Sequence, residues 1–475
     1  MNAGERLLKD YSQNKARLAG HSMPWLTGIR ECARESFAVQ GLPEVSDEDW
    51  KYTKLTQLAQ ANYGFAERLD STFIASLADN VLNKLIFAAE HRLVFVNGHY
   101  NESLSTINLL PEGVILTSLA QAIEEHAELL SSTLGSIADY ATHPFTALNT
   151  AMLSDGVFLL AQKNTKIETP IHCLFISTAT EQSVVNYPRL LLLLDESAEL
   201  TLVEHYLDMA QLKSGMAQTL SDHNFINHNL TNCVTEVLLS PHAHMDHYKL
   251  QYDSTDTSHI AAMYVEQQRA STFTSHSYSV GAALARNDIQ IKLVDSQAEC
   301  ILNGAYLVAG RQHVDYHTQI EHLAPGCNSR QIYKGVIHGR GRAVFNGKVI
   351  IHSQAQQSSA NQLNKNLLLG EKAEVDTKPE LQIYADDVKC SHGATVGQLD
   401  EQALFYLQSR GVCKKDAQNW LVNGFVSEVL KLIDNPVLRE FIQLTVIAHL
   451  NQLAGGDVKS LQELISTGEG VMPCH

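Results

Sequence analysis

A cysteine and a histidine lie two residues apart in the segment DDVKCSHGATVGQ, which spans residues 386–398. In an extended strand, residues i and i+2 point to the same side, with α-carbons roughly 6 to 7 Å apart, so Cys390 and His392 could reach one metal ion. A thiolate and an imidazole suit zinc, iron or an iron–sulfur cluster, and Lys389 could lower the pKa of the thiol. Two ligands make only half of a tetrahedral set. The pattern therefore indicates either a site completed by another chain or an unrelated cysteine and histidine at a strand end.

A rival candidate is the histidine-rich segment PHAHMDHYK. It follows the H-x-H-x-D-H order of metallo-β-lactamase-type hydrolases, in which the ligands surround one or two zinc ions; the residues are His242, His244, Asp246 and His247. Here the segment runs from CVTEVLLS directly into HYKLQYDS, with no glycine-rich turn or helix after it. In a strand, His242, His244 and Asp246 face one side and His247 the other. A polar strand face is the favoured interpretation, and a zinc-dependent hydrolase is kept as the enzyme alternative.

A third polar segment, AGRQHVDYHTQIEH, carries His313, Asp315, His317 and His322. Most of these residues are two apart, which is typical of one face of a strand. A face so rich in imidazole could bind a metal weakly, but alternating polar residues explain the pattern adequately.

The composition excludes several classes of protein. With 475 residues, 44% hydrophobic and 18% charged, the chain can bury a large core, about two or three domains in size. The net charge of −17 and the lack of long basic runs argue against nucleic acid as a partner. No segment has the apolar character of a signal peptide or a membrane span, which predicts a cytoplasmic protein without a membrane partner. The eight cysteines form no C-x-x-C pair and are expected to be reduced thiols.

Three regions with different patterns follow one another along the chain. Residues 1–150 are predicted to be mostly helical, and residues 399–475 to form a small helical module. Between them, residues 151–398 contain many short β-rich runs split by Gly, Asn, Asp and Pro, such as PRLLLLLDESAELTLVEHY. These runs predict a mainly β region, either a barrel, a sandwich or a β-solenoid. The glycines do not recur at one period, so the pattern leaves these three open.

Two amphipathic helices are predicted in the C-terminal module. In KKDAQNWLVNGFVSEVLKLI the apolar face comprises Leu421, Phe425, Val429 and Leu432. In VLREFIQLTVIAHLNQLAGG it comprises Leu438, Phe441, Ile442, Val446, Leu450 and Leu453. So many apolar residues exceed what a small three-helix module can bury alone, which predicts a partner for it.

The segment from 335 to 412, GVIHGRGRAVFNGKVIIHSQAQQSSANQLNKNLLLGEKAEVDTKPELQIYADDVKCSHGATVGQLDEQALFYLQSRGV, resembles the core of the SufB/SufD family of SUF iron–sulfur cluster assembly proteins. Further similar pieces are GLPEVSDEDWKYTKL, LVFVNGHYNESLS, LNTAMLSDGVFLLAQKNTKIETPI, ARNDIQIKL and CILNGAYLVAGRQHVDYHT. The resemblance covers most of the chain. It implies a right-handed parallel β-helix core flanked by N-terminal and C-terminal α-helical regions.

The resemblance also implies a non-catalytic scaffold within a complex. Family members pair with a SufB-like paralogue through the β-helix and bind a SufC-like ABC-type ATPase through the C-terminal helices, and a homodimer is expected when the chain is isolated. The iron–sulfur cluster is transient, forms at the interface with the SufB-like chain and is not held tightly by one chain alone. His392 matches the family's interface histidine and Cys390 its neighbour.

Within the family, the sequence is more similar to the SufD branch. SufB-like chains carry a cysteine cluster towards the N-terminus, whereas only Cys32 precedes Cys173 here. The pieces GLPEVSDEDWKYT and K-C-S-H-G also favour SufD. A SufB-like scaffold that holds a cluster by itself remains the alternative within the family.

Overall fold

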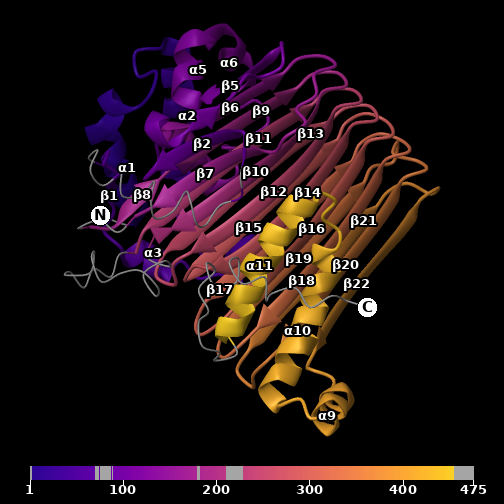
Figure 1. Cartoon of the computed structure of the whole chain (residues 1–475). Coiled ribbons are helices and arrows are strands. Elements are labelled where there is room, and N and C mark those ends of the chain that lie inside the picture. The colour runs from indigo at the N-terminus through magenta and orange to yellow at the C-terminus, as the bar shows by residue number, and fades with distance from the viewer. Residues whose placement is uncertain are drawn as a thin grey trace.

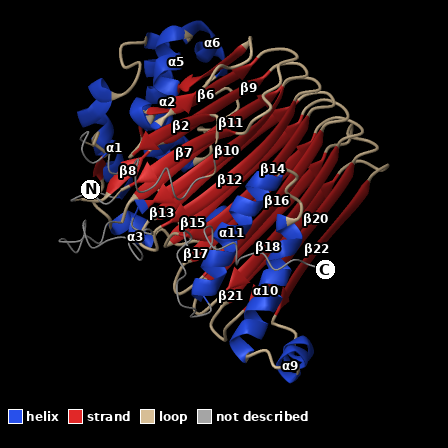
Figure 2. Cartoon of the chain, viewed as in Figure 1, coloured by secondary structure: helices blue, strands red, loops and turns tan. Residues whose placement is uncertain are grey.

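The computed structural model describes residues 3–69, 74, 87, 89–178, 182–209 and 228–453. Two long β-sheets lie face to face, with helices at both ends of the chain (Figures 1 and 2). The chain crosses repeatedly between the sheets, and nearly all neighbouring strands are parallel. The mainly β fold and the β-helix that the resemblance implies are confirmed, and the structure selects the solenoid over the barrel and the sandwich.

The strands divide between the two sheets in chain order. Sheet I contains β1 (Gly64–Phe65), β5 (Val114–Ser118), β6 (Asp155–Ala161), β8 (Val184–Asn186), β9 (Pro188–Leu194), β11 (Leu230–Leu239), β13 (Ser258–Gln267), β15 (Leu284–Leu293), β17 (His313–His322), β19 (Arg342–Ile351) and β21 (Glu374–Ile383). Sheet II contains β2 (His91–Val96), β3 (His99–Tyr100), β4 (Thr106–Ile107), β7 (Ile171–Ser177), β10 (Glu199–Asp208), β12 (His244–Asp253), β14 (Thr272–Gly281), β16 (Glu299–Val308), β18 (Asn328–Ile337), β20 (Ser359–Leu368) and β22 (Lys389–Gly397). From β9 onwards, the chain changes sheet after every strand.

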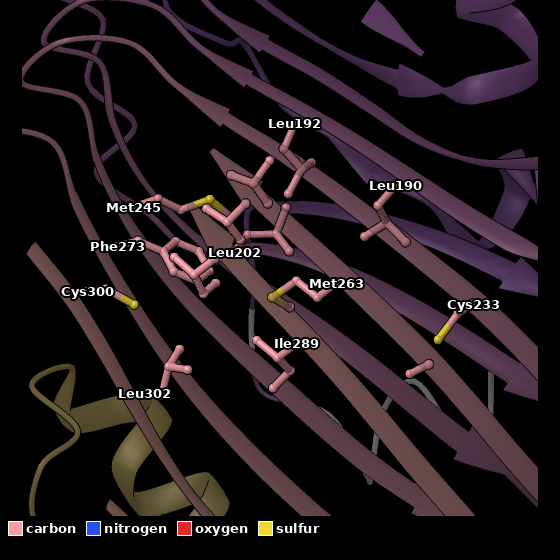
Figure 3. Close-up of a cluster of buried hydrophobic side chains, with 14 of the residues drawn as sticks. Leu190, Leu192, Leu202, Cys233, Met245, Met263, Phe273, Ile289, Cys300 and Leu302 are labelled. Carbon is pink, nitrogen blue, oxygen red and sulfur yellow. The ribbon is translucent and has the colours of Figure 1, made fainter. Parts of the chain in front are cut away.

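Every second side chain of these strands fills the space between the sheets. On β16, Cys300, Leu302 and Tyr306 point inwards and are fully buried. In-register pairing places Phe273 of β14 beside Cys300, and Figure 3 shows these two residues within the core together with Met263. A slip of one residue would turn the whole apolar set outwards, so burial fixes the register of each turn.

One corner of the solenoid consists of residues in the left-handed backbone region. Successive turns place there Ser197, His242, Ala270, Gln297, Gly326 and Gln357, with φ between 52° and 70°. The amide of one corner donates to a carbonyl of the next, as from His242 N to Arg269 O at 2.9 Å. Only Gly326 among them is glycine, so this corner gives the glycines no period, whereas Gly310, Gly339 and Gly370 stack on one another at another corner of the last turns. The expectation that His242 continues the following strand is wrong, because β12 begins at His244.

N-terminal helices cover the outer face of the first strands of sheet I (Figure 2). They are α1 (Ala3–Asn14), α2 (Pro24–Gln40), α3 (Thr56–Gln60), α5 (Leu119–Glu125), α6 (Ala127–Thr133) and α7 (Pro144–Met152), with 3-10 helices at Lys15–Arg17 and Glu48–Trp50. A further 3-10 helix, Glu102–Leu104, packs on the first strands of sheet II. A fully buried ion pair, Arg189–Glu236 at 2.6 Å, lies beneath the helices on sheet I. Glu236 also accepts hydrogen bonds from the amides of Gly135 and Ala138. The charge of each partner is therefore satisfied, as a buried pair requires.

The C-terminal helices α9 (Glu401–Ser409), α10 (Lys414–Leu430) and α11 (Pro436–Leu453) follow the end of the solenoid, and α10 and α11 lie across the outer face of sheet II (Figure 1). The predicted apolar face of α11 is confirmed from Leu438 to Leu450. The face predicted for α10 is confirmed at Val429 and in part at Phe425, which is partly buried against sheet II, but Leu421 and Leu432 do not belong to it. The fully buried residues are Ala417, Val422, Val426, Val429 and Leu430. Residues 454–475 of the expected C-terminal module, with Cys474, lie outside the described residues.

No helix in the described ranges combines the length and apolar character needed to cross a lipid bilayer.

Candidate functional site at the open end of the β-helix

The solenoid ends in two strands that each have one free edge. Within the described residues, β21 pairs only with β19 and β22 only with β20. Their outer edges therefore present backbone N–H and C=O groups that no strand of this chain satisfies. Apolar side chains are exposed here as well: Val396 is 49% exposed and Ile383 40% exposed. An edge of this length is suited to pairing with another chain.

Cys390 and His392 lie on β22, the last strand of sheet II. Their neighbours in register are Ala360 and Gln362, both of which are buried in the interior of the solenoid. Cys390 and His392 therefore lie on the interior side of the terminal strand, two positions apart. His392 is exposed at the open end, whereas Cys390 is half-buried.

The thiol of Cys390 is a poor candidate for an activated ligand. It packs against a small apolar cluster that includes Ile351 and Ala385. Burial raises the pKa of this thiol above its usual value of 9.0, and a backbone hydrogen bond near Ala360 opposes this only in part. The expectation that Lys389 lowers this pKa is wrong, because β22 is extended and Lys389 points to the opposite side of the strand from Cys390.

A buried glutamine beneath the open end was not found from the sequence. Gln362 is 1% exposed, and neither its Nε2 nor its Oε1 has a hydrogen-bond partner within the described residues. Its amide occupies the space beside Gly347 of β19, where an added Cβ would come within 1.7 Å of Nε2. An unpaired amide costs free energy in the interior. No local sequence pattern marks Gln362, because its neighbours come from other turns of the solenoid.

The H-x-H-x-D-H residues do not form a zinc site. His242 lies in the corner, and His244 and Asp246 contact each other at 3.4 Å on the outer face of sheet II. His247 points into the interior, where its Nε2 lies 3.1 Å from Glu204 and its Nδ1 3.0 Å from Ser275. The corner, the outer face of β12 and the interior of the solenoid are three separate places, and the backbone of β12 lies between the last two. The expected opposition of His244 and His247 across the strand is thus seen, and it separates the residues that a hydrolase would need together.

Residues of the third histidine-rich segment contact the N-terminal region, which packs on the outer face of β17. Asp315 binds Arg286 at 2.8 Å and His317 at 3.1 Å on the outer face of β17, and the Thr53 hydroxyl lies 2.8 Å from His313. His322 lies on the interior side, 2.8 Å from the Ser329 hydroxyl. Across the described residues, no group of three or more His, Cys, Asp or Glu side chains is arranged to hold a metal ion.

Comparisons with known proteins match most of the chain to one family. The family model "SufBD protein N-terminal region" matches residues 1–173, and "SUF system FeS cluster assembly, SufBD core domain" matches residues 175–425. An iron–sulfur cluster assembly SufBD family protein of Synechocystis sp. is 32% identical over 421 residues, which cover 89% of this chain and 90% of that protein.

Two relatives are named iron–sulfur cluster assembly protein SufD. The Escherichia coli protein is 30% identical over 429 residues, covering 88% of this chain and 90% of its own length. The Bacillus subtilis protein is 26% identical over 447 residues, covering 90% and 95%. The resemblance read from the sequence segments is confirmed, and the chain belongs to the SufBD family of SUF-system iron–sulfur cluster assembly proteins.

Proposed function

We propose that this chain is a non-catalytic scaffold subunit that pairs through the open end of its β-helix with a SufB-like chain. His392, with Cys390 in a secondary role, contributes to a transient iron–sulfur cluster that forms as cargo where the two chains meet. The observation that carries the proposal is the position of His392: it is exposed on the interior side of a terminal strand whose edge is free. A half-set of ligands at an edge suited to pairing is what a shared site requires.

His392 is preferred over Cys390 for two reasons. Its side chain is exposed at the open end, whereas burial keeps the Cys390 thiol partly covered and raises its pKa. A neutral imidazole also binds iron less tenaciously than a thiolate and can be released by protonation. Such a ligand suits a site that must give up its product.

The test compares His392→Ala, Cys390→Ala and a matched control, Ser391→Ala. Ser391 lies between the two on β22 and contacts Asn361 on the opposite side of the strand, so it reports the general effect of altering this strand. In a strain that depends on this pathway, maturation of an iron–sulfur enzyme should fall sharply for His392→Ala, mildly for Cys390→Ala and not for Ser391→Ala. All three should still co-purify with the partner subunits. Full activity of His392→Ala would refute the assignment, and loss of subunit pairing would make the residue structural.

The C-terminal module is proposed to bind a SufC-like ABC ATPase. Most of the apolar residues predicted to need a partner are covered by sheet II, but Phe405 on α9 is 73% exposed, Tyr406 57% and Trp420 on α10 46%. A groove of about 820 Å³ runs between these helices and the end of sheet II, lined by residues that include His338 and Leu404. Exposed aromatic residues beside a groove are typical of an interface.

Point variants test this better than removal of residues 399–475, which would uncover the outer face of sheet II. Phe405→Asp should abolish co-purification of the ATPase and leave pairing with the SufB-like chain intact. Val39→Asp is the control, because Val39 is 88% exposed on α2 in the N-terminal region. ATPase binding that survives both Phe405→Asp and Trp420→Asp would rule out this surface.

Metal content distinguishes the alternatives. The proposal expects the isolated subunit, as monomer or homodimer, to purify with almost no zinc and no stable cluster. A zinc-dependent hydrolase would retain zinc, and a SufB-like scaffold would give a stable brown protein after anaerobic reconstitution without a partner.

A further inference from the structure

A second group of reactive side chains lies deep inside the solenoid, far along the chain from β22. Cys233 on β11, His259 on β13 and Asp253 at the end of β12 point into the interior and are buried. The Asp253 carboxylate lies 3.1 Å from His259 Nδ1, and His259 Nε2 lies 3.7 Å from the Cys233 sulfur. The carboxylate, imidazole and thiol thus stand in line, the order found where a thiol acts as a nucleophile.

A lysine adds positive charge on the other side of the sulfur. Lys249 Nζ lies 3.9 Å from the Cys233 sulfur and donates to Asn287 Oδ1 at 3.0 Å. Burial raises the pKa of Cys233, but the charges of Lys249 and His259 outweigh it, and the net pKa is lowered. The fully buried Cys173 and Cys300 have no such neighbours, and burial raises their pKa values.

A small cavity lies next to this cluster, against Lys249 and Asn287. It has a volume of about 10 Å³ and is lined by residues that include Glu204, Thr235, Lys249 and Asn287, and Lys249 lies between it and the Cys233 sulfur. The Asn287 amide nitrogen is buried and has no hydrogen-bond partner within the described residues. Space of this size holds about one water molecule, so only a reagent close to water in size can enter.

We propose that Cys233, with His259 and Asp253, is a buried oxidation site for hydrogen peroxide. The Cys233 thiolate attacks one peroxide oxygen, the O–O bond breaks, and the leaving hydroxide takes the proton of the His259 imidazolium to become water. The sulfur is oxidised to a sulfenic acid while the peroxide is reduced to water. Lys249 and the free Asn287 N–H group can donate to the oxygens, and the charge of the Asp253 carboxylate favours the protonated form of the imidazole. This reaction is independent of the cluster-assembly role.

The test uses the full-length protein and its own cysteines as controls. The protein is exposed to dilute hydrogen peroxide, quenched in denaturant with a sulfenic-acid trap and a thiol-alkylating reagent, and analysed by peptide mass spectrometry. Cys233 should be oxidised at least about ten-fold faster than Cys173 and Cys300, because the thiolate is the reactive form. These two cysteines are equally buried, so unfolding alone would oxidise all three alike. Equal rates for the three cysteines would overturn the proposal without any variant.

A variant then tests the role of the imidazole. His259→Asn should slow oxidation of Cys233 towards the rate of Cys300 and leave the rate of Cys300 unchanged. An unchanged Cys233 rate in this variant, with native circular dichroism, would show that His259 does not activate the thiol. Should His259→Asn fail to fold, Lys249→Met provides the same comparison, and the wild-type rates stand by themselves.

Discussion

At the level of single residues, the sequence motif shows which side chains lie at the open end of the β-helix but not what they contact. The spacing of Cys390 and His392 correctly indicated a common side of one strand, because an extended backbone has a period of two. It could not show that the thiol packs against Ile351, since that contact arises between turns of the solenoid. The same limit hid Gln362, whose unpaired amide beneath His392 follows from the fold alone.

Gln362 gives a prediction about stability. Replacing it by Met, which has a similar shape, removes a buried amide that has no hydrogen bond, so the free energy of unfolding should rise by roughly 1 to 3 kcal/mol. Gln331→Met is the matched control: Gln331 is equally buried in the neighbouring turn and its Nε2 is also unpaired, but its Oε1 accepts a hydrogen bond from Thr318 at 2.7 Å. Urea unfolding followed by circular dichroism measures both. A Gln362→Met protein destabilised as much as Gln331→Met would show that the amide is satisfied in solution.

At the scale of secondary-structure elements, the alternation of strands was easier to predict than their connections. The short β-rich runs identified a mainly β region, but the corner residues Ser197, Ala270 and Gln297 adopt a left-handed backbone that nothing in their type demands. The buried face of α10 differs from the predicted one because the helix packs on β16 and β18 of sheet II. Its orientation is set by residues of these strands, such as Leu307 and Val336, rather than by its own period.

The 3-10 helix Glu48–Trp50 is held on sheet I by one arginine. Arg286 is buried, binds Asp315 and Asp288 at 2.8 Å each, and lies 3.8 Å from the Trp50 ring. Arg286→Met should lower the free energy of unfolding by about 3 to 5 kcal/mol, because it leaves the buried Asp315 carboxylate without its main partner. The control, Lys378→Met, removes a surface ion pair with Glu48 and should change little. Equal effects in denaturant unfolding would contradict this account of the anchor.

Buried histidines on the outer face of sheet II, which α11 covers in part, predict that acid destabilises the folded chain. Burial lowers the pKa of His205 and of His276 from 6.5 to about 4, and it lowers the pKa of His172 well below 6.5. The unfolded chain therefore binds more protons than the folded chain between pH 6.5 and 4. The free energy of unfolding should fall as the pH drops through this window.

The buried carboxyl of Asp155 has the opposite effect on the pH dependence of the free energy of unfolding. A histidine variant is therefore needed to measure the contribution of the histidines. Burial raises the pKa of Asp155 from 3.8 to about 6, which favours the folded state as the pH falls. Unfolding in urea at several pH values between 7 and 4 should show a shallower loss for His205→Gln than for the wild type. Identical pH slopes would mean that His205 is not buried in its neutral form.

At the scale of the whole molecule, the sequence supported a β-solenoid mainly through its resemblance to a family. The corner from Ser197 to Gln357 consists of residues of different types, and glycines recur only at the corner of the last turns, at Gly310, Gly339 and Gly370. The sequence pattern therefore could not separate a solenoid from a barrel. The candidate site was visible only as half of a ligand set. In the folded chain that half-set lies where both sheets end, and the missing ligands are expected from a second chain.

The most direct test of this account is the iron and acid-labile sulfide content of the complex purified without oxygen. This chain, its SufB-like partner and the ATPase are expressed together, and wild type is compared with His392→Ala and with Ser391→Ala. We expect all three preparations to contain the same subunits, and the His392→Ala complex alone to lose its iron and sulfide. A His392→Ala complex that carries as much iron and sulfide as the wild type would contradict a shared cluster site at the open end of the β-helix.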